Sequence, residues 1–121
     1  MNENAFIVPQ GTKIIESGAF NGRKDLKNAI IPDSVTEIVD WALVDCSSLK
    51  SIVIPDSVTE IGDGAFFGCS SLESVDIPNS VATIGEDAFA ICDSLKSVVI
   101  PNSAVEIADE AFDEDCTIIF S

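Results

Sequence analysis

Hydrophobic and polar residues follow one pattern that repeats every 23 residues along this chain. In a representative repeat, Leu49, Ile52 and Ile54 form a short apolar run that ends at Pro55, which lacks an N–H for a further ladder bond. This pattern predicts a short strand. Val58 and Ile61 then face inward on either side of the polar Thr59 and Glu60 and predict a second short extended segment.

The connections between these segments carry turn residues. Residues 55–57, Pro-Asp-Ser, predict a reversal of the chain. We expect Gly62 to supply a φ that other residues resist. Ala65 and Phe66 then enter a compact bend or a short helical turn, so each repeat has two inward-facing walls and a bulky apolar plug.

Three columns of identical or similar residues share the 23-residue spacing. They are the prolines, the alanines and the large apolar plugs: Pro9, Pro32, Pro55, Pro78, Pro101; Ala19, Ala42, Ala65, Ala88, Ala111; Phe20, Leu43, Phe66, Phe89, Phe112. A unit of this length cannot bury its apolar face alone, so neighbouring units must stack to complete the core. The sequence therefore predicts a solenoid.

Composition and charge limit the classes of partner that the chain can bind. The 121 residues are 46% hydrophobic, which is ample for a continuous core, and the net charge is −15. This charge argues against nucleic acid and anionic membranes but leaves proteins, cations and neutral glycans. No segment reaches the roughly 20 apolar residues that span a bilayer. Residues 1–10 lack the features of a signal peptide, so either the chain is intracellular or its signal lies outside this sequence.

The cysteines form a further column. Cys46, Cys69 and Cys92 share the repeat spacing, and Cys116 lies one residue beyond its expected position. Stacked turns would bring neighbouring cysteines within disulfide range, but a stack of three must leave one thiol unpaired. We expect buried free thiols. A zinc site would need four ligands and would have to recruit the displaced Cys116, because histidine is absent.

The pattern LxxIxIPxSVTxIGxxAFxxC resembles the BspA-like, or Treponema-type, leucine-rich repeat over nearly the whole chain. The resemblance implies a β-rich α/β repeat: a right-handed solenoid of about five turns with a parallel sheet on one side. It also implies a surface or secreted protein engaged in adhesion to host matrix proteins or other cells. Residues 1–121 then form one solenoid, with a partial repeat at 1–13 and an irregular repeat at 113–121.

Residues that alternate with the buried strand positions define the candidate binding face. On this sheet face we expect Ser51, Val53, Ser74, Asp76, Ser97 and Val99. Asp76 interrupts an apolar column, and Glu73 interrupts the lysine column of Lys27, Lys50 and Lys96. The pair of carboxylates suits a basic group on a partner. Alternatively, Glu73 forms surface salt bridges with Lys50 and Lys96, which contribute under about 1 kcal/mol.

Trp41 occupies a column that holds Gly18, Gly64, Asp87 and Glu110 in the other repeats. An exposed indole there would suit a partner anchor. Alternatively, Trp41 folds over Leu43, the smaller plug of its own repeat.

Acidic residues form a full column of their own: Asp40, Asp63, Glu86 and Asp109. A calcium site needs six or more converging oxygens, whereas a column offers carboxylates in a row, so we expect a solvated face and no metal or cofactor. Catalysis is also not expected. Histidine and tyrosine are absent, and no nucleophile elbow or phosphate-binding loop is present.

These observations predict a non-catalytic binding module that presents its sheet face to a protein or glycan. The alternative is a structural spacer or assembly unit that interacts through its ends. The final strand, residues 117–121, is an open edge without a following cap. Three explanations remain open for it: further repeats follow, two copies stack end to end, or the nearby acidic run suffices to repel edge pairing.

Overall fold

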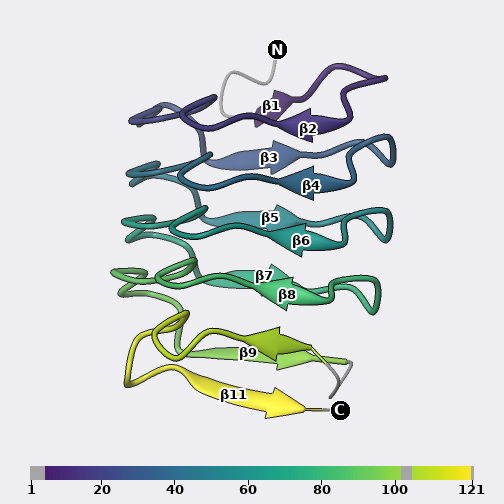
Figure 1. The fold of residues 1–121 in the computed structure, drawn as a ribbon. Helices are drawn as coiled ribbons and strands as arrows, with labels where there is room; N and C mark the ends of the chain where they lie inside the picture. The colour runs from purple at the N-terminus through teal and green to yellow at the C-terminus, as the bar shows by residue number, and fades with distance from the viewer. Residues whose placement is uncertain (1–4, 102–104, 121) are drawn as a thin grey trace.

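The computed structural model describes residues 5–101 and 105–120 and contains eleven strands but no helix within those ranges. Residues 1–4 of the predicted N-terminal partial repeat lie outside the described residues. The chain forms a parallel β-solenoid of about five turns, stacked along one axis from the N-terminal to the C-terminal end (Figure 1). The expected α component is absent from the described residues, because the predicted compact bend or short helical turn is a series of hydrogen-bonded turns, such as the one from the Phe67 N–H to the Gly64 carbonyl at 3.0 Å.

Two strands lie in most turns, one on each side of the solenoid. The first sheet has four parallel strands: β1 (Ala5–Ile7), β3 (Asn28–Ile30), β5 (Ser51–Val53) and β7 (Ser74–Asp76). The second sheet has five: β2 (Ile14–Ile15), β4 (Glu37–Ile38), β6 (Glu60–Ile61), β8 (Thr83–Ile84) and β10 (Glu106–Ile107). The expected parallel sheet on one side is therefore present, and the second extended segment of each repeat forms a further sheet.

The C-terminal end departs from the regular register. Strands β9 (Ser97–Ile100) and β11 (Thr117–Phe120) form a separate parallel pair. Ser74 pairs with Ser51 at the repeat spacing of 23 residues, whereas Thr117 pairs with Ser97, only 20 residues earlier. The last turn is thus shorter than the others.

The core is a continuous apolar column between the two sheets. The wall residues Ile52 and Ile61 are buried, as the alternation predicted. The rings of Phe66 and Phe89 stack with centroids 4.9 Å apart, and those of Phe89 and Phe112 with centroids 5.0 Å apart. Each turn therefore covers the plug of its neighbour, which is why the repeat needs a stack to bury its apolar surface.

The bends contain two columns of residues with left-handed backbone. One holds Gly18, Trp41, Gly64 and Asp87, and the other holds Gly22, Asp45, Gly68 and Ile91, with φ between 55° and 80°. Gly62 is not among them, so the expected role of its φ is wrong. Close packing explains that glycine instead, because a Cβ there would overlap the backbone and carboxylate of Asp40 in the preceding turn.

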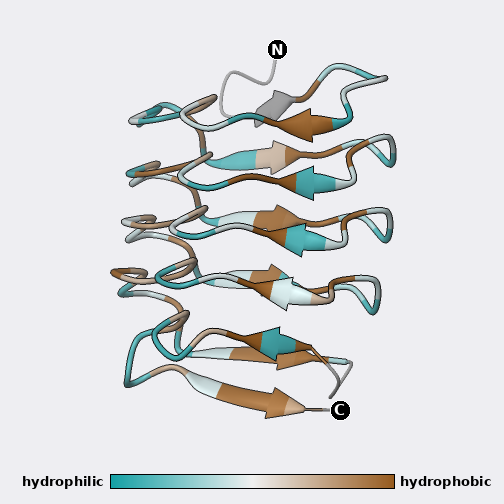
Figure 2. Cartoon of the chain, viewed as in Figure 1, coloured by the Kyte–Doolittle hydropathy of each residue, from teal (hydrophilic) through white to brown (hydrophobic). Residues whose placement is uncertain are grey.

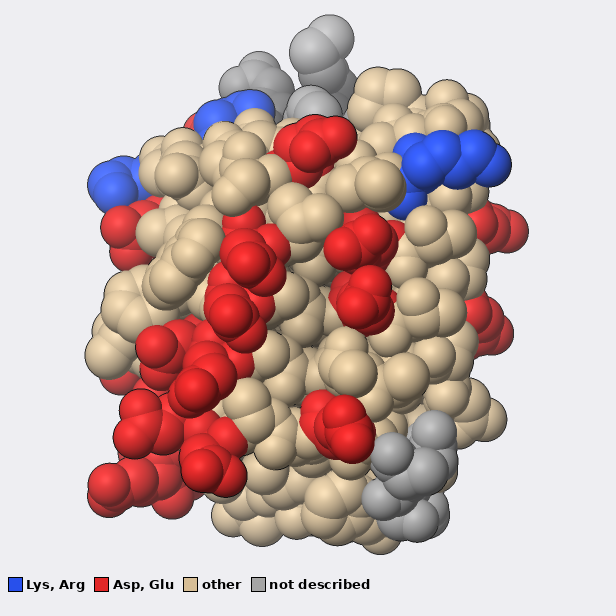
Figure 3. Space-filling model, in the orientation of Figure 1, with Lys and Arg blue, Asp and Glu red and all other residues tan. Residues whose placement is uncertain are grey.

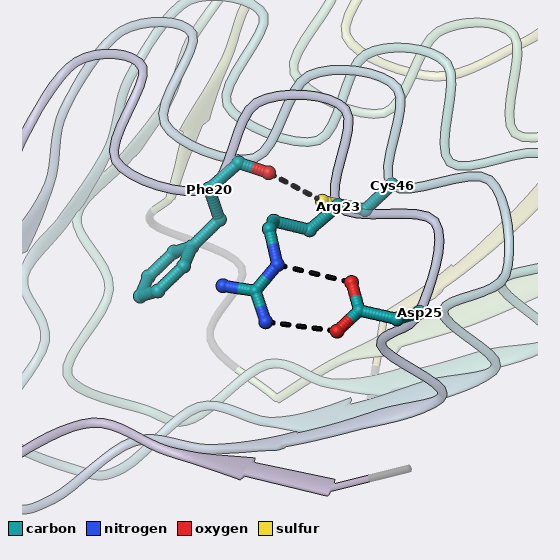
Figure 4. Close-up of polar contacts among 4 residues, drawn as sticks. All are labelled: Phe20, Arg23, Asp25 and Cys46. Carbon is teal, nitrogen blue, oxygen red and sulfur yellow. Dashed lines mark hydrogen bonds and ion pairs between the residues drawn. The ribbon is translucent and has the colours of Figure 1, made fainter. Parts of the chain in front are cut away.

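The buried cysteines hold consecutive turns together as free thiols, which confirms the prediction. Each donates its S–H to a backbone carbonyl one turn back: Cys46 to Phe20 at 3.0 Å (Figure 4), Cys69 to Leu43 at 3.2 Å and Cys92 to Phe66 at 3.3 Å. Three plug residues thus have their carbonyl oxygens satisfied by this column.

Candidate functional site

An exposed apolar column runs along the outer face of the first sheet and continues onto the β9–β11 pair. Ile30, Val53 and Val99 each leave about half or more of their surface exposed, and Ile119 continues the column beside Val99. Asp76 is also exposed and lies directly beside Val53 in the sheet register. Strand alternation forces these side chains outward, since their neighbours along each strand fill the core.

A hydroxyl column lies beside the apolar one. The Ser51 hydroxyl donates a hydrogen bond to the Asn28 side-chain oxygen at 2.8 Å. Ser74 and Ser97 are exposed in the following two turns. The sheet face therefore combines apolar contact area with groups that donate and accept hydrogen bonds.

A groove opens in this face between β7 and β9. These strands lie on consecutive turns (Figure 1), yet no hydrogen-bond ladder joins them among the described residues, whereas β8 and β10 are paired. The groove has a volume of about 310 Å³, and its lining includes four of the predicted site residues: Ser74, Asp76, Ser97 and Val99. Peptide groups along the facing strand edges are thereby left available for water or a ligand.

Glu73 is exposed but does not line this groove. Its alternative role in salt bridges is wrong for the described residues, whose two ion pairs involve other acids. Lys96 contacts Asp115 at 3.3 Å instead, and Arg23 forms a bidentate pair with Asp25 (Figure 4). The hydrogen bond from Arg23 lowers the pKa of the Asp25 carboxyl.

Trp41 lies in the bend that follows β4, away from the outer face of the sheet that carries the other predicted residues. Its indole covers Gly64 of the next turn and meets the Phe67 ring edge-on, with centroids 5.8 Å apart. Trp41 therefore packs across turns. The side chain remains 42% exposed.

Two members of the acidic column have a structural role. The Asp40 carboxylate accepts the N–H of Asp63 at 2.8 Å, and the Asp63 carboxylate accepts the N–H of Glu86 at 2.9 Å. Acidic side chains gather on the face that carries β4, β6 and β8 and toward its lower left (Figure 3). Within the described residues, no group of three or more acidic or cysteine side chains could hold a metal ion.

Cys69 and Cys92 are poor nucleophiles. Burial raises the pKa of Cys92 to about 12, and the nearby Asp113 carboxylate contributes to the shift. The interaction with Cys46 and burial raise the pKa of Cys69 as well. Since the thiolate is the reactive form, these side chains pack the core and bond to backbone instead.

The repeat pattern matches a known family profile, the BspA type leucine rich repeat region, in six copies over residues 2–119. The chain belongs to the BspA type leucine-rich repeat family. The family's repeat accounts for the 23-residue columns and the parallel solenoid. No curated protein sequence shows significant similarity to the chain.

Three solved structures of leucine-rich repeat proteins resemble this family member closely. A cell surface protein from Faecalibacterium prausnitzii is 37% identical, with a TM-score of 0.90, and the match covers 98% of this chain and 32% of that one. A protein from Bacteroides ovatus is 32% identical, with a TM-score of 0.85 and coverage of 97% and 33%. A protein from T. pallidum is 33% identical, with a TM-score of 0.80 and coverage of 86% and 50%.

The chain thus spans about a third of the length of the first two of these structures. One of them is described as a cell surface protein. The part of this chain that the structure describes contains no helix that is long and apolar enough to cross a bilayer. Leucine-rich repeats are generally non-catalytic scaffolds, and the absence of catalysis here stays a prediction.

Sequence reasoning missed the groove and Pro101 in its lining, because strand separation is not encoded by any one residue. It also missed Ile91, which is half exposed and has a φ of 55°. Other repeats have glycine in the same column, at Gly22 and Gly68. These glycines are the sequence signal that could have identified the left-handed backbone of Ile91. In this column Asp45 and Ile91, which replace glycine, keep its left-handed backbone.

Proposed function

We propose that the chain is a non-catalytic module that binds a protein partner through the outer face of its first sheet and of β9 and β11. The observation that carries this proposal is the exposed column of Ile30, Val53, Val99 and Ile119, interrupted by Asp76 beside the groove. Contiguous exposed apolar residues next to polar groups are typical of interaction surfaces. Asp76 supports the choice of a partner that places a basic group against the groove.

The cell surface is the proposed setting of this interaction. A structural relative is described as a leucine rich cell surface protein, and family resemblance implies adhesion to host or neighbouring cells. The partner would then be a matrix or surface protein. A glycan partner is the second outcome that the experiment below distinguishes.

The test is a pull-down from host-cell surface and matrix extract with the wild type, Asp76→Arg and the control Glu60→Arg. Glu60 is exposed on the second sheet, so its substitution makes the same change of charge on the other face. Circular dichroism first checks that all three proteins fold. We expect Asp76→Arg to lose a captured band that Glu60→Arg retains.

Enzymatic deglycosylation of the extract separates the partner classes. A band that survives this treatment supports protein recognition, whereas one that disappears indicates a glycan. Equal capture by all three proteins would exclude the sheet face as the binding surface.

Strand β11 favours a second candidate function, that of an assembly unit. Strand β11 is hydrophobic along most of its length (Figure 2), and Ile119 and Phe120 leave about half of their surface exposed. Among the described residues β11 pairs with β9 on one edge only, so its other edge is available to another copy. If copies stack end to end, Ile119→Lys should reduce the mass measured by light scattering to that of a monomer. An unchanged mass would contradict self-association.

A further inference from the structure

The bends that join the second sheet to the first carry a separate exposed apolar patch, on the left of the solenoid in Figure 1. We define the bend patch as Trp41, Val44, Phe67 and Ile91. Trp41 and Ile91 are 42% and 50% exposed, and Val44 and Phe67 are half-buried. We propose that the bend patch binds a second protein partner through a segment that combines apolar and basic side chains.

At this patch large side chains occupy the left-handed backbone that the bends of the solenoid share. Trp41 and Ile91 have left-handed φ values of 61° and 55°, at columns where other turns place glycine. This conformation is unfavourable for a large side chain and is a clear outlier for a β-branched one. Ile91 remains half exposed, so core burial does not compensate for its strain. Such strain is typical of functional positions.

Trp41 is held in place before any partner arrives. Its indole rests against the backbone of Gly64, where no side chain competes for the space, and the Phe67 ring meets it edge-on. A rigid, half-exposed aromatic side chain loses little conformational entropy on binding. Tryptophan at such a position is the residue type most often found as an interface anchor.

Charge around the patch specifies the partner. The three bends at residues 40–48, 63–71 and 86–94 contain no lysine or arginine. They contain six acidic residues: Asp40, Asp45, Asp63, Glu86, Asp87 and Asp93. An apolar segment flanked by lysine or arginine would cover the patch and pair with these carboxylates. An anionic surface would be repelled.

The patch is independent of the sheet face proposed above. Trp41 and Ile91 lie in bends, and neither contributes to the lining of the groove between β7 and β9. A solenoid with both surfaces would bind two partners at once. Loss of one interaction would leave the other intact.

The probe is a synthetic twelve-residue peptide that alternates lysine and leucine. Because Trp41 is the single tryptophan, its fluorescence reports binding at the patch directly. We expect saturable binding with a blue shift of the emission. Ile91→Asn should weaken binding at least five-fold, since asparagine accepts the left-handed backbone but removes the apolar contact. Val53→Asn on the sheet face is the matched control and should bind like the wild type.

Two further measurements complete the test. A peptide with lysine and serine in place of lysine and leucine should bind at least five-fold more weakly. Trp41→Gly, which restores the glycine of other repeats, should lose binding by calorimetry while circular dichroism shows a folded chain. The proposal is overturned if the peptide leaves Trp41 unaffected, if the serine peptide binds equally well, or if Ile91→Asn and Val53→Asn weaken binding alike.

Discussion

Replacement of Gly64 by alanine is a direct test of how Trp41 packs across turns. Gly64 is buried beneath the indole and has a φ of +62°. A Cβ at this position would overlap the six-membered ring of Trp41. The alanine therefore introduces two separate penalties, one from the left-handed backbone and one from displacement of the indole.

The two penalties are similar in size, and a control variant separates them. Left-handed backbone costs an alanine about 1–2 kcal/mol of unfolding free energy. The indole is 42% exposed, so displacing its buried half sacrifices about another 1–2 kcal/mol of burial and aromatic contact. We expect Gly64→Ala to cost about 2–4 kcal/mol in total. Gly22→Ala isolates the backbone penalty, because Gly22 has a φ of +68° with no neighbouring atom within 4 Å.

The assay is urea unfolding followed by far-ultraviolet circular dichroism, with Gly64→Ala made both in the wild type and in Trp41→Gly. Without the indole, only the backbone penalty remains, so the cost of Gly64→Ala should fall to about 1–2 kcal/mol. The difference is a coupling free energy of about 1–2 kcal/mol between the two positions, estimated as for residues in contact. Tryptophan fluorescence adds a second readout. Trp41 should emit at longer wavelength in Gly64→Ala than in the wild type, because the displaced indole is more exposed to water.

Two results would refute this reasoning. If Gly64→Ala costs no more than Gly22→Ala, the indole does not occupy the space above Gly64. If the cost is equal with and without Trp41, the two residues are not coupled. A changed slope of unfolding free energy against urea would indicate a different unfolded or partly folded state, and the comparison would then rest on the fluorescence shift.

Three other features of the stack lead to measurable outcomes. The pKa of Cys92 is about 12 in the fold against an ordinary 9.0, so the contribution of this thiol to stability is complete below pH 9 and is lost as the pH rises toward 12. In urea unfolding at alkaline pH, Cys92→Ala should therefore lose stability with rising pH less steeply than the wild type. Equal slopes of unfolding free energy against pH would contradict the raised pKa. The Asp113 carboxylate accepts the N–H groups of Ile91 at 2.9 Å and Cys92 at 3.1 Å. Asp113→Ala should cost about 1–3 kcal/mol and speed hydrogen exchange at both amides, whereas unchanged exchange would rule out the contact. Asp40→Ala should cost about 1 kcal/mol of unfolding free energy and speed hydrogen exchange at the Asp63 amide. If the Asp63 amide of this variant exchanges as slowly as in the wild type, the Asp40 carboxylate is only solvated and does not accept this hydrogen bond.

The regular part of the fold was predictable from residue spacing. The buried positions of Ile52, Ile61 and Phe66 follow from alternation within a repeat and from columns between repeats. A wall residue has the same neighbours in every turn, so one repeat predicts the next. The same logic predicted the outward direction of Val53 and Asp76.

The candidate site was predictable only in part. Alternation correctly indicated which residues of the sheet face point outward, but it could not reveal that β7 and β9 lack a ladder. The position of Trp41 over Gly64 depends on contact between turns, and the expected packing over Leu43 considered one repeat alone. Likewise, Lys96 reaches Asp115 because the last turn is shortened, which no spacing of the earlier repeats anticipates.

By itself the sequence determined the solenoid, its 23-residue repeat, its buried thiols and its acidic surface, because each depends on a local pattern that recurs in every turn. Only the tertiary structure decided where the repeat opens, which acids bond to backbone and how the bend patch is assembled. Those features arise from the fit between adjacent turns. That fit depends on residues about 23 positions apart in the chain and on the backbone strain that each turn can bear.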